Sequence, residues 1–210
     1  ATRGKIEGMV QRYGAQTVAS VLAGALDAGE RLFRQRLGTI PDGRWSHRVY
    51  TEAAVPGDRG VYCYQTNLTK TGDRLIVDNR GTDPQVGAIS LTFGPYSGAV
   101  FAALTSQMAA DLAGVYGGVY RCVEFDLEPG LLSSPNHPAP ISYTGANPVG
   151  SCIYAATIAV GKMLSCSRDP DVRALALGPT IPHFYTNGLE FDRPGGGLDT
   201  GPPDRDVLLR

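Results

Sequence analysis

The sequence predicts an α+β protein in which an antiparallel meander sheet packs against several helices and many residues lie in loops. Three observations predict this class: a long segment of helical periodicity near the start, three alternating segments joined by short turns, and two later helical stripes. The chain has 210 residues, of which 42% are hydrophobic and 19% charged, so it can bury a core of its own. Its 27 glycines and 15 prolines indicate many turns.

The first element predicted is a helix over about Lys5–Leu37. Gly14 and Gly24 each weaken a helix, so this element is either two helices or one kinked helix. We expect the arginines near its end to complement the helix dipole and to contact solvent rather than to bind an anion: Arg31, Arg34 and Arg36. The apolar residues recur at steps of three, four and seven, the spacing of one helix face: Val10, Val18, Val21, Leu22, Ala25, Leu26, Leu32 and Phe33.

Three strands are expected next, over Arg44–Thr51, Gly60–Thr69 and Arg74–Asp78. Side chains in a strand point to alternate faces, and both longer segments alternate in character. The connections are short, and Lys70–Asp73 forms a hairpin turn with Gly72 at positive φ, so we predict an antiparallel meander. In the first strand one face is expected to carry Trp45, His47 and Val49, and the other Ser46, Arg48 and Tyr50. In the second strand one face is expected to carry Val61, Cys63, Gln65 and Asn67, and the other Tyr62, Tyr64, Thr66 and Leu68.

The second half of the chain predicts more helices around an extended loop. Leu131–Ala146 contains three prolines, which remove backbone donors, and is expected to be extended. A helix comes next, with Asn147 as its N-cap and Pro148 at the first helical position. The remaining elements expected are a helix at Ser97–Leu112, a fourth strand at Val119–Leu127, a helix at Val149–Leu164 and a weaker helix at Pro170–Ala176.

We divide the chain into a core over residues 1–177 and a Gly/Pro-rich segment over residues 178–210. The second segment contains Gly195-Gly196-Gly197 and Pro202-Pro203 and has few apolar residues, so it is expected to be a tail or a loop that contacts a partner.

Composition argues against several classes of function. The net charge is −1 and the pI is about 6.3, so no basic field favours nucleic acid or an anionic membrane. The four cysteines lack metal or redox spacing and are expected to be buried free thiols of a cytoplasmic protein: Cys63, Cys122, Cys152 and Cys166. No phosphate-binding loop and no nucleophile elbow is present, so a partner chain is expected to bind any ATP that is used.

Four segments carry a resemblance to a known family: residues 37–45, 72–86, 124–140 and 145–147 with the helix after them. Within the second, Asp78, Gly81, Thr82 and Gln85 resemble the signature Asp-x-x-Gly-Thr-x-x-Gln. In order and spacing the chain is similar to the middle section of the hydantoinase B family. That family comprises the B-type subunits of N-methylhydantoin hydrolases, 5-oxoprolinases, caprolactamases, and acetone and acetophenone carboxylases.

The resemblance implies an ATP-dependent carboxylase or cyclic-amide hydrolase complex. In such a complex a larger hydantoinase A-like subunit binds ATP and Mg²⁺ and phosphorylates the substrate, and the B-type subunit handles the attack on the activated substrate. A divalent metal is possible in the complex, but the residues that match here include no metal ligands, so we assign none. Family members are longer, and we expect this chain to be a fragment, a diverged subunit or, preferably, a split subunit.

Such chemistry needs a proton-transfer group and donors for an oxyanion. The catalytic candidates are Asp78, Asp83 and Asn147, and the substrate-binding candidates are Gly81, Thr82, Gln85, His137 and His183. The alternative for each is structural, because Asp and Asn form turns and caps and a His can lie in a loop or a core. Three functions therefore stay open: a catalytic subunit, a non-catalytic structural subunit of the same complex, or an unrelated soluble binding domain.

Overall fold

The computed structural model describes residues 2–52, 57–110, 116–141 and 148–177, and the two short strands β5 (Leu189–Glu190) and β6 (Asp199–Thr200). The chain divides into two compact units, residues 1–178 and residues 179–210. In the second unit β5 and β6 pair antiparallel. The first unit contains all the other described helices and strands.

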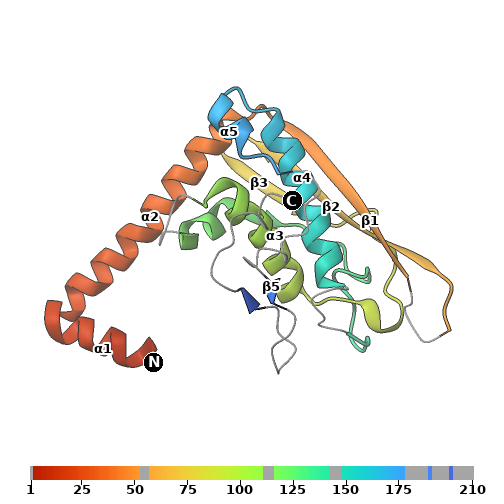
Figure 1. Cartoon of the computed structure of the whole chain (residues 1–210), viewed down its shortest axis with the longest axis horizontal. Helices are drawn as coiled ribbons and strands as arrows, with labels where there is room; N and C mark the ends of the chain where they lie inside the picture. The colour runs from red at the N-terminus through yellow and green to blue at the C-terminus, as the bar shows by residue number, and fades with distance from the viewer. Residues whose placement is uncertain are drawn as a thin grey trace. The chain divides into compact units, whose positions relative to one another are not determined.

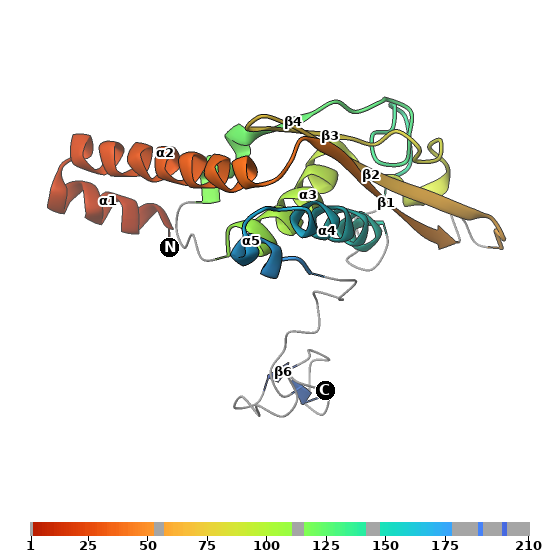
Figure 2. The ribbon, with the colours of Figure 1, turned by 90° about the horizontal axis from the view of Figure 1, so that it is seen from above.

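The N-terminal segment forms two helices, α1 (Thr2–Tyr13) and α2 (Ala15–Thr39). Gly14 separates them with φ 82°, a left-handed conformation that favours glycine, whereas Gly24 lies inside α2 without ending it. Of the two alternatives left open by the sequence, two helices is therefore correct. In Figure 1 the two helices diverge from the turn that joins them, and Figures 1 and 2 show that only the far end of α2 reaches the sheet. The buried residues of α2 accordingly lie in its second half: Gly29, Phe33 and Leu37.

The sheet has four strands in the order β1-β2-β3-β4. The first two pairs are antiparallel, as predicted, and the hairpin turn is Gly72-Asp73 with Gly72 at φ 62°. The strand bounds are β1 (Gly43–Glu52), β2 (Val61–Thr71), β3 (Arg74–Asp78) and β4 (Val123–Phe125).

The fourth strand is shorter than predicted, and its parallel pairing departs from the antiparallel meander predicted for the sheet. β4 covers three residues and pairs parallel to β3, with Leu75 opposite Val123. A parallel neighbour needs a long crossover, which the chain makes through the helix α3 (Phe93–Met108), so the sheet as a whole is not a meander. Residues Tyr116–Cys122, most of which we expected in this strand or just before it, form the 3-10 helix η2 instead.

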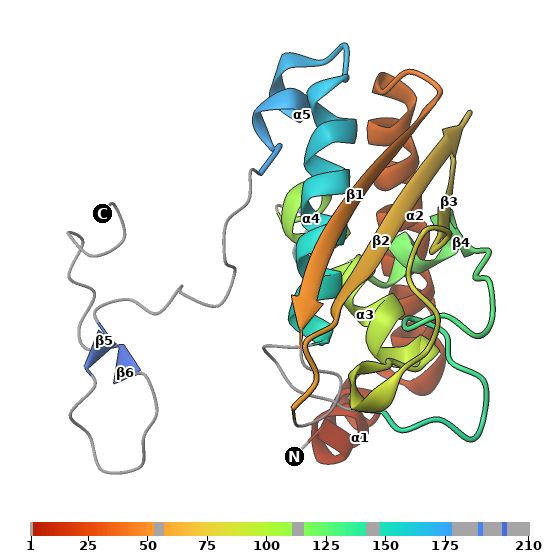
Figure 3. The same cartoon turned by 90° about the vertical axis from the view of Figure 1, so that its right-hand side faces the viewer.

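Two helices cover one face of the sheet (Figures 2 and 3). The helix α4 (Val149–Ser165) packs on β1 and β2, and α3 (Phe93–Met108) packs beside α4. The structure places α3 four residues earlier at both ends than predicted. α4 begins where predicted, but Pro148 is its N-cap residue rather than its first helical residue. The core between these layers includes Tyr64, Leu68, Leu75, Val77, Val100, Leu104, Met108, Ala156 and Val160.

Two short elements complete the unit. The 3-10 turn η1 (Gly87–Ile89) precedes α3, and α5 (Pro170–Ala174) comes after α4. α5 has Asp169 as its N-cap, and the Asp169 side chain accepts a hydrogen bond from the amide of Asp171 at 2.9 Å.

One half-buried histidine predicts a dependence of stability on pH. His47 of β1 faces α4, where Lys162 Nζ lies 3.4 Å from His47 Nδ1 and donates to the Ser46 carbonyl at 2.8 Å. Burial, and then the Lys162 ammonium, lower the pKa of His47 below its usual 6.5. The folded protein therefore binds fewer protons at His47 than the unfolded chain, so this contribution to stability is present above pH 6.5 and is lost as the pH falls.

We expect the urea midpoint of the wild-type protein to fall more steeply than that of His47→Gln between about pH 8 and about pH 5. Equal slopes in the two proteins would show that His47 does not titrate differently on folding. Lys162→Met is the matched control, because it removes only the smaller of the two causes and is expected to reduce the difference without abolishing it.

Candidate functional site

The face of the sheet away from α4 is polar. Ser46, Arg48, Gln65 and Asn67 lie on it, because Arg48 pairs with Gln65 and Ser46 with Asn67, and directly paired residues of an antiparallel sheet share a face. Asn67 in turn pairs with Asp78 at the end of β3. We call this surface the polar sheet face and define it by Arg44, Arg48, Gln65, Asn67 and Asp78.

A chain of hydrogen bonds crosses the polar sheet face. Arg48 Nε donates to Gln65 Oε1 at 2.5 Å, and Gln65 Nε2 donates to Asn67 Oδ1 at 2.6 Å. Asn67 Nδ2 donates to Asp78 Oδ1 at 2.6 Å, and Arg44 Nη2 donates to Asp78 Oδ2 at 3.0 Å. A guanidinium can only donate and a carboxylate can only accept, so the two ends fix the orientation of both amides between them.

Asp78 is the acceptor at which this chain ends. It is 5% exposed, and besides Asn67 and Arg44 it accepts the backbone amide of Arg80 at 3.0 Å. The Arg80 guanidinium lies 2.9 Å from Asp126 Oδ2 and 3.8 Å from Asp78 Oδ1. Both oxygens of Asp78 are therefore engaged with this protein, and the side chain holds the end of β3 to β1 and β2.

Thr82 and Asp83 continue the sheet beyond the end of β3. Thr82 Oγ1 accepts the Gln65 amide at 2.9 Å and donates to the Gln65 carbonyl at 3.1 Å. Asp83 Oδ2 accepts the Cys63 amide at 2.8 Å, and the Asp83 amide donates to the Cys63 carbonyl at 3.0 Å. Gly81 makes this approach possible, because its φ is 94° and a Cβ there would lie 2.3 Å from Gln65 Oε1.

The loop that follows β4 is hydrogen-bonded to the loop that follows β3. Asn79 is fully buried, with its Oδ1 accepting the Glu128 amide at 2.8 Å and its Nδ2 donating to Ser133 Oγ at 3.0 Å. Gln85 Oε1 accepts the amide of Asn136 at 2.6 Å, and the next residue, His137, is exposed. The structure therefore brings Gln85 close to the segment that carries His137. Asn147 and His183 lie outside the described residues.

Thr82→Val tests the role of this hydroxyl. Valine keeps the shape but leaves the amide and carbonyl of Gln65 without a partner at a residue that is 5% exposed, so we expect a loss of about 2 kcal/mol in the free energy of unfolding. Urea unfolding measures it. Thr82→Ser keeps the hydroxyl and should lose clearly less; an equal loss in both variants would attribute the effect to packing of the methyl group.

Three of the four cysteines offer little nucleophilic chemistry. All four are free, and the expectation that all are buried was wrong for Cys166, which is exposed. Burial raises the pKa of the Cys152 thiol far above its usual range, and burial also raises the pKa values of Cys63 and Cys122. These three thiols therefore stay protonated at neutral pH and serve as small core residues.

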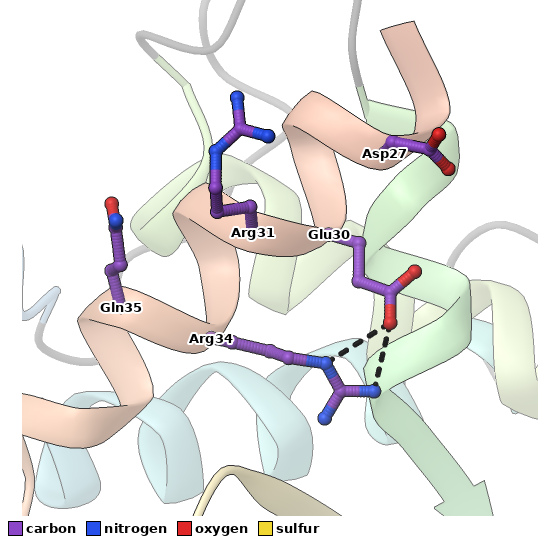
Figure 4. A pocket seen from close by; sticks show the side chains of 5 residues that line it. All are labelled: Asp27, Glu30, Arg31, Arg34 and Gln35. Carbon is purple, nitrogen blue, oxygen red and sulfur yellow. Dashed lines mark hydrogen bonds and ion pairs between the residues drawn. The ribbon is translucent and has the colours of Figure 1, made fainter. Parts of the chain in front are cut away.

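A groove lies on α2, away from the polar sheet face. It measures about 550 Å³ and is lined by Asp27, Glu30, Arg31, Arg34 and Gln35 (Figure 4). Arg34 donates to Glu30 Oε1 from Nε and Nη2, each at 3.0 Å, and to the carbonyl of Asp73 at 2.9 Å. Arg34 therefore holds a neighbouring element as well as facing solvent, and this groove contains none of the candidate residues.

No three His, Cys, Asp or Glu side chains among the described residues come close enough together to hold a metal ion. The described residues thus do not fit a metal centre, and we route no chemical step through one. Within the same residues, no helix is long and apolar enough to cross a membrane.

The sequence profile of a family described as hydantoinase B/oxoprolinase matches residues 2–183. The chain belongs to this family. The resemblance inferred from the four sequence segments is confirmed, and the match extends over all the elements that surround the polar sheet face. A search of curated proteins found no match to this hydantoinase B chain.

Two solved structures are similar to this hydantoinase B chain. An ATP-dependent caprolactamase from Pseudomonas jessenii matches with a TM-score of 0.63 and 25% identity, over 75% of this chain and 27% of that chain. A nucleotide-free acetone carboxylase matches with a TM-score of 0.65 and 14% identity, over 77% of this chain and 23% of that chain, and shows the likeness of fold alone. The chain thus spans about a quarter of the length of either structure.

Sequence reasoning missed four members of the polar sheet face: Arg44, Arg48, Gln65 and Asn67. The signal was present, because the alternation already placed Gln65 and Asn67 on one face and Arg48 opposite the apolar side of β1. Only the register shows that these residues meet at Asp78.

Proposed function

We propose that this chain is a subunit, or a segment of a subunit, of an ATP-dependent carboxylase or cyclic-amide hydrolase complex. The observation that carries the proposal is the family match over residues 2–183, supported by the likeness at 25% identity to an enzyme described as an ATP-dependent caprolactamase. The sequence contains no phosphate-binding loop of the Walker type. We therefore assign ATP and Mg²⁺ to a larger hydantoinase A-like subunit, and we place the complex in the cytoplasm.

Within this proposal the candidate residues have different roles. Asp78, Gly81, Thr82 and Asp83 are positioning residues, because their contacts hold two loops to β2 and β3. Gln85 positions the segment before His137, whose exposed imidazole we assign to proton transfer. Asn147 and His183 remain candidates for contacts with the substrate.

Co-expression with a hydantoinase A-like subunit tests the proposal. The chain should elute in a complex far above its own 22.2 kDa, and that complex should hydrolyse ATP only when a lactam, a hydantoin, or a ketone with bicarbonate is present. His137→Ala should lower kcat and leave assembly intact. His47→Gln, at a structural histidine, should leave both kcat and assembly unchanged. A chain that stays monomeric beside every such subunit would refute the proposal.

A non-catalytic structural subunit is the second candidate. It is favoured by the contacts of Thr82 and Asp83, whose side chains bind backbone groups of β2. Asp78→Asn and Asn147→Ala in the assembled complex separate the two functions. Full activity with intact assembly in both variants and in His137→Ala would favour the structural role.

A further inference from the structure

The hairpin formed by α1 and α2 carries apolar side chains on its surface. Five of them are 41–65% exposed: Ile6, Met9, Tyr13, Val21 and Leu22. Between the two helices lies a groove of about 290 Å³, which we call the hairpin groove and define by its lining residues, Met9, Tyr13, Thr17, Val18, Val21 and Leu22. Contiguous apolar surface of this kind marks interaction sites in soluble proteins.

The hairpin has little support of its own. No residue of α1 is buried, and α1 contains Gly4 and Gly8, which disfavour a helix. A helix of 12 residues is marginal in water unless an amphipathic face is packed. Figure 2 shows the hairpin extending away from the sheet. A partner that fills the hairpin groove would stabilise both helices.

Charge identifies the chemistry of that partner. Lys5 and Arg12 are seven residues apart on α1 and lie on one flank of Met9, so they form a basic edge along the hairpin groove. The Arg12 guanidinium lies 5.4 Å from the centre of the Tyr13 ring. Among the described residues neither cation pairs with a carboxylate. The acidic residue of α1, Glu7, binds Arg3 at 2.8 Å on the other flank.

We propose that the hairpin groove binds an amphipathic helix of another subunit, with an apolar stripe that enters the groove and carboxylates that face Lys5 and Arg12. Helices recognised in grooves use this combination of apolar and charged contacts. A second copy of the chain is a poor occupant, because the carboxylates of its hairpin are already paired within the chain: Glu7 with Arg3, Asp27 with Arg121 and Glu30 with Arg34. The proposal rests on the assignment of this chain to a multi-subunit complex, but not on the reaction that the complex performs.

Two synthetic peptides of about 15 residues, four helical turns long, test the proposal on the full chain. Both carry the same leucine stripe; one has glutamates along a flank and its twin has lysines. By fluorescence anisotropy we expect the acidic peptide to bind about tenfold more tightly, with a preference that shrinks as salt is added. Arg12→Glu should abolish the preference, whereas Arg3→Glu, on the opposite flank of α1, should preserve it.

Leu22→Asp should abolish binding of both peptides. Because Leu22 is 56% exposed, circular dichroism should show that the rest of the fold is unchanged. Equal affinity for the two peptides, or no binding of either, would overturn the proposal. So would a dimer of the chain alone on sizing that Leu22→Asp converts to a monomer, since the occupant would then be a second copy.

Discussion

Replacing Gly118 by alanine is expected to lower the free energy of unfolding by about 3 kcal/mol. A Cβ at Gly118 would lie 2.2 Å from Glu30 N and from Leu26 O, and 2.7 Å from Gly29 C, all backbone atoms of α2. Backbone cannot move aside as a side chain can, so the whole of η2 must shift away from the helix.

That contact joins α2 to the sheet. η2 leads directly into β4, and Arg121 of η2 reaches Asp27 Oδ1 at 2.8 Å and Glu30 Oε2 at 3.3 Å on α2. A shift of η2 would therefore disturb both the ion pairs and the parallel pairing of β4 with β3. Urea unfolding measures the loss.

Two glycines provide matched controls. At Gly117 a Cβ would meet Leu26 Cδ2 at 2.5 Å, which is the end of a flexible side chain, so Gly117→Ala should lose much less stability. At Gly98, inside α3, a Cβ would meet nothing within 4 Å, so alanine should add about 0.5–1 kcal/mol. If Gly117→Ala and Gly118→Ala lose the same amount, close backbone packing is not the cause.

Asp78→Ala is expected to have an effect of similar size, a loss of about 3 kcal/mol. The substitution removes the acceptor of Asn67, of the Arg80 amide and of Arg44, and it does so at a residue that is 5% exposed. Asn67 keeps its hydrogen bond to the Arg80 carbonyl at 2.8 Å, so the network loses some of its hydrogen bonds but not all of them. Asp78→Asn keeps one acceptor oxygen and should lose less.

Double-mutant cycles apportion this loss. The Arg44 side chain is 57% exposed, so its coupling to Asp78 should be below about 1 kcal/mol. Asn67 is 1% exposed, and its coupling to Asp78 should be the larger of the two. If Arg44 couples more strongly than Asn67, the solvent-exposed ion pair rather than the buried amide stabilises the end of β3.

Local sequence signals were reliable where one element decides the outcome. The alternation of β2, the hairpin at Gly72, the break at Gly14 and the start of α4 all follow from side-chain period and backbone preference within a few residues. α3 begins four residues earlier than predicted, at Phe93, and its N-cap residue, Thr92, makes no side-chain capping hydrogen bond.

The family was also within reach of the sequence, since the order of short segments around Asp78–Gln85 is a property of the chain itself. What Asp78 and Asp83 contact was not. An aspartate after a strand can be a turn former or a catalytic base, and the sequence favours the turn former without giving the partners of its oxygens.

Those partners come from distant segments, and only the tertiary structure decided them. Asp78 receives Arg44 from β1 and Asn67 from β2, and Asp83 receives the amide of Cys63, because strand register brings residues 11–34 positions apart into contact. The parallel direction of β4 has the same origin. It depends on how far α3 carries the chain and on the close approach of Gly118 to α2, which no local pattern encodes.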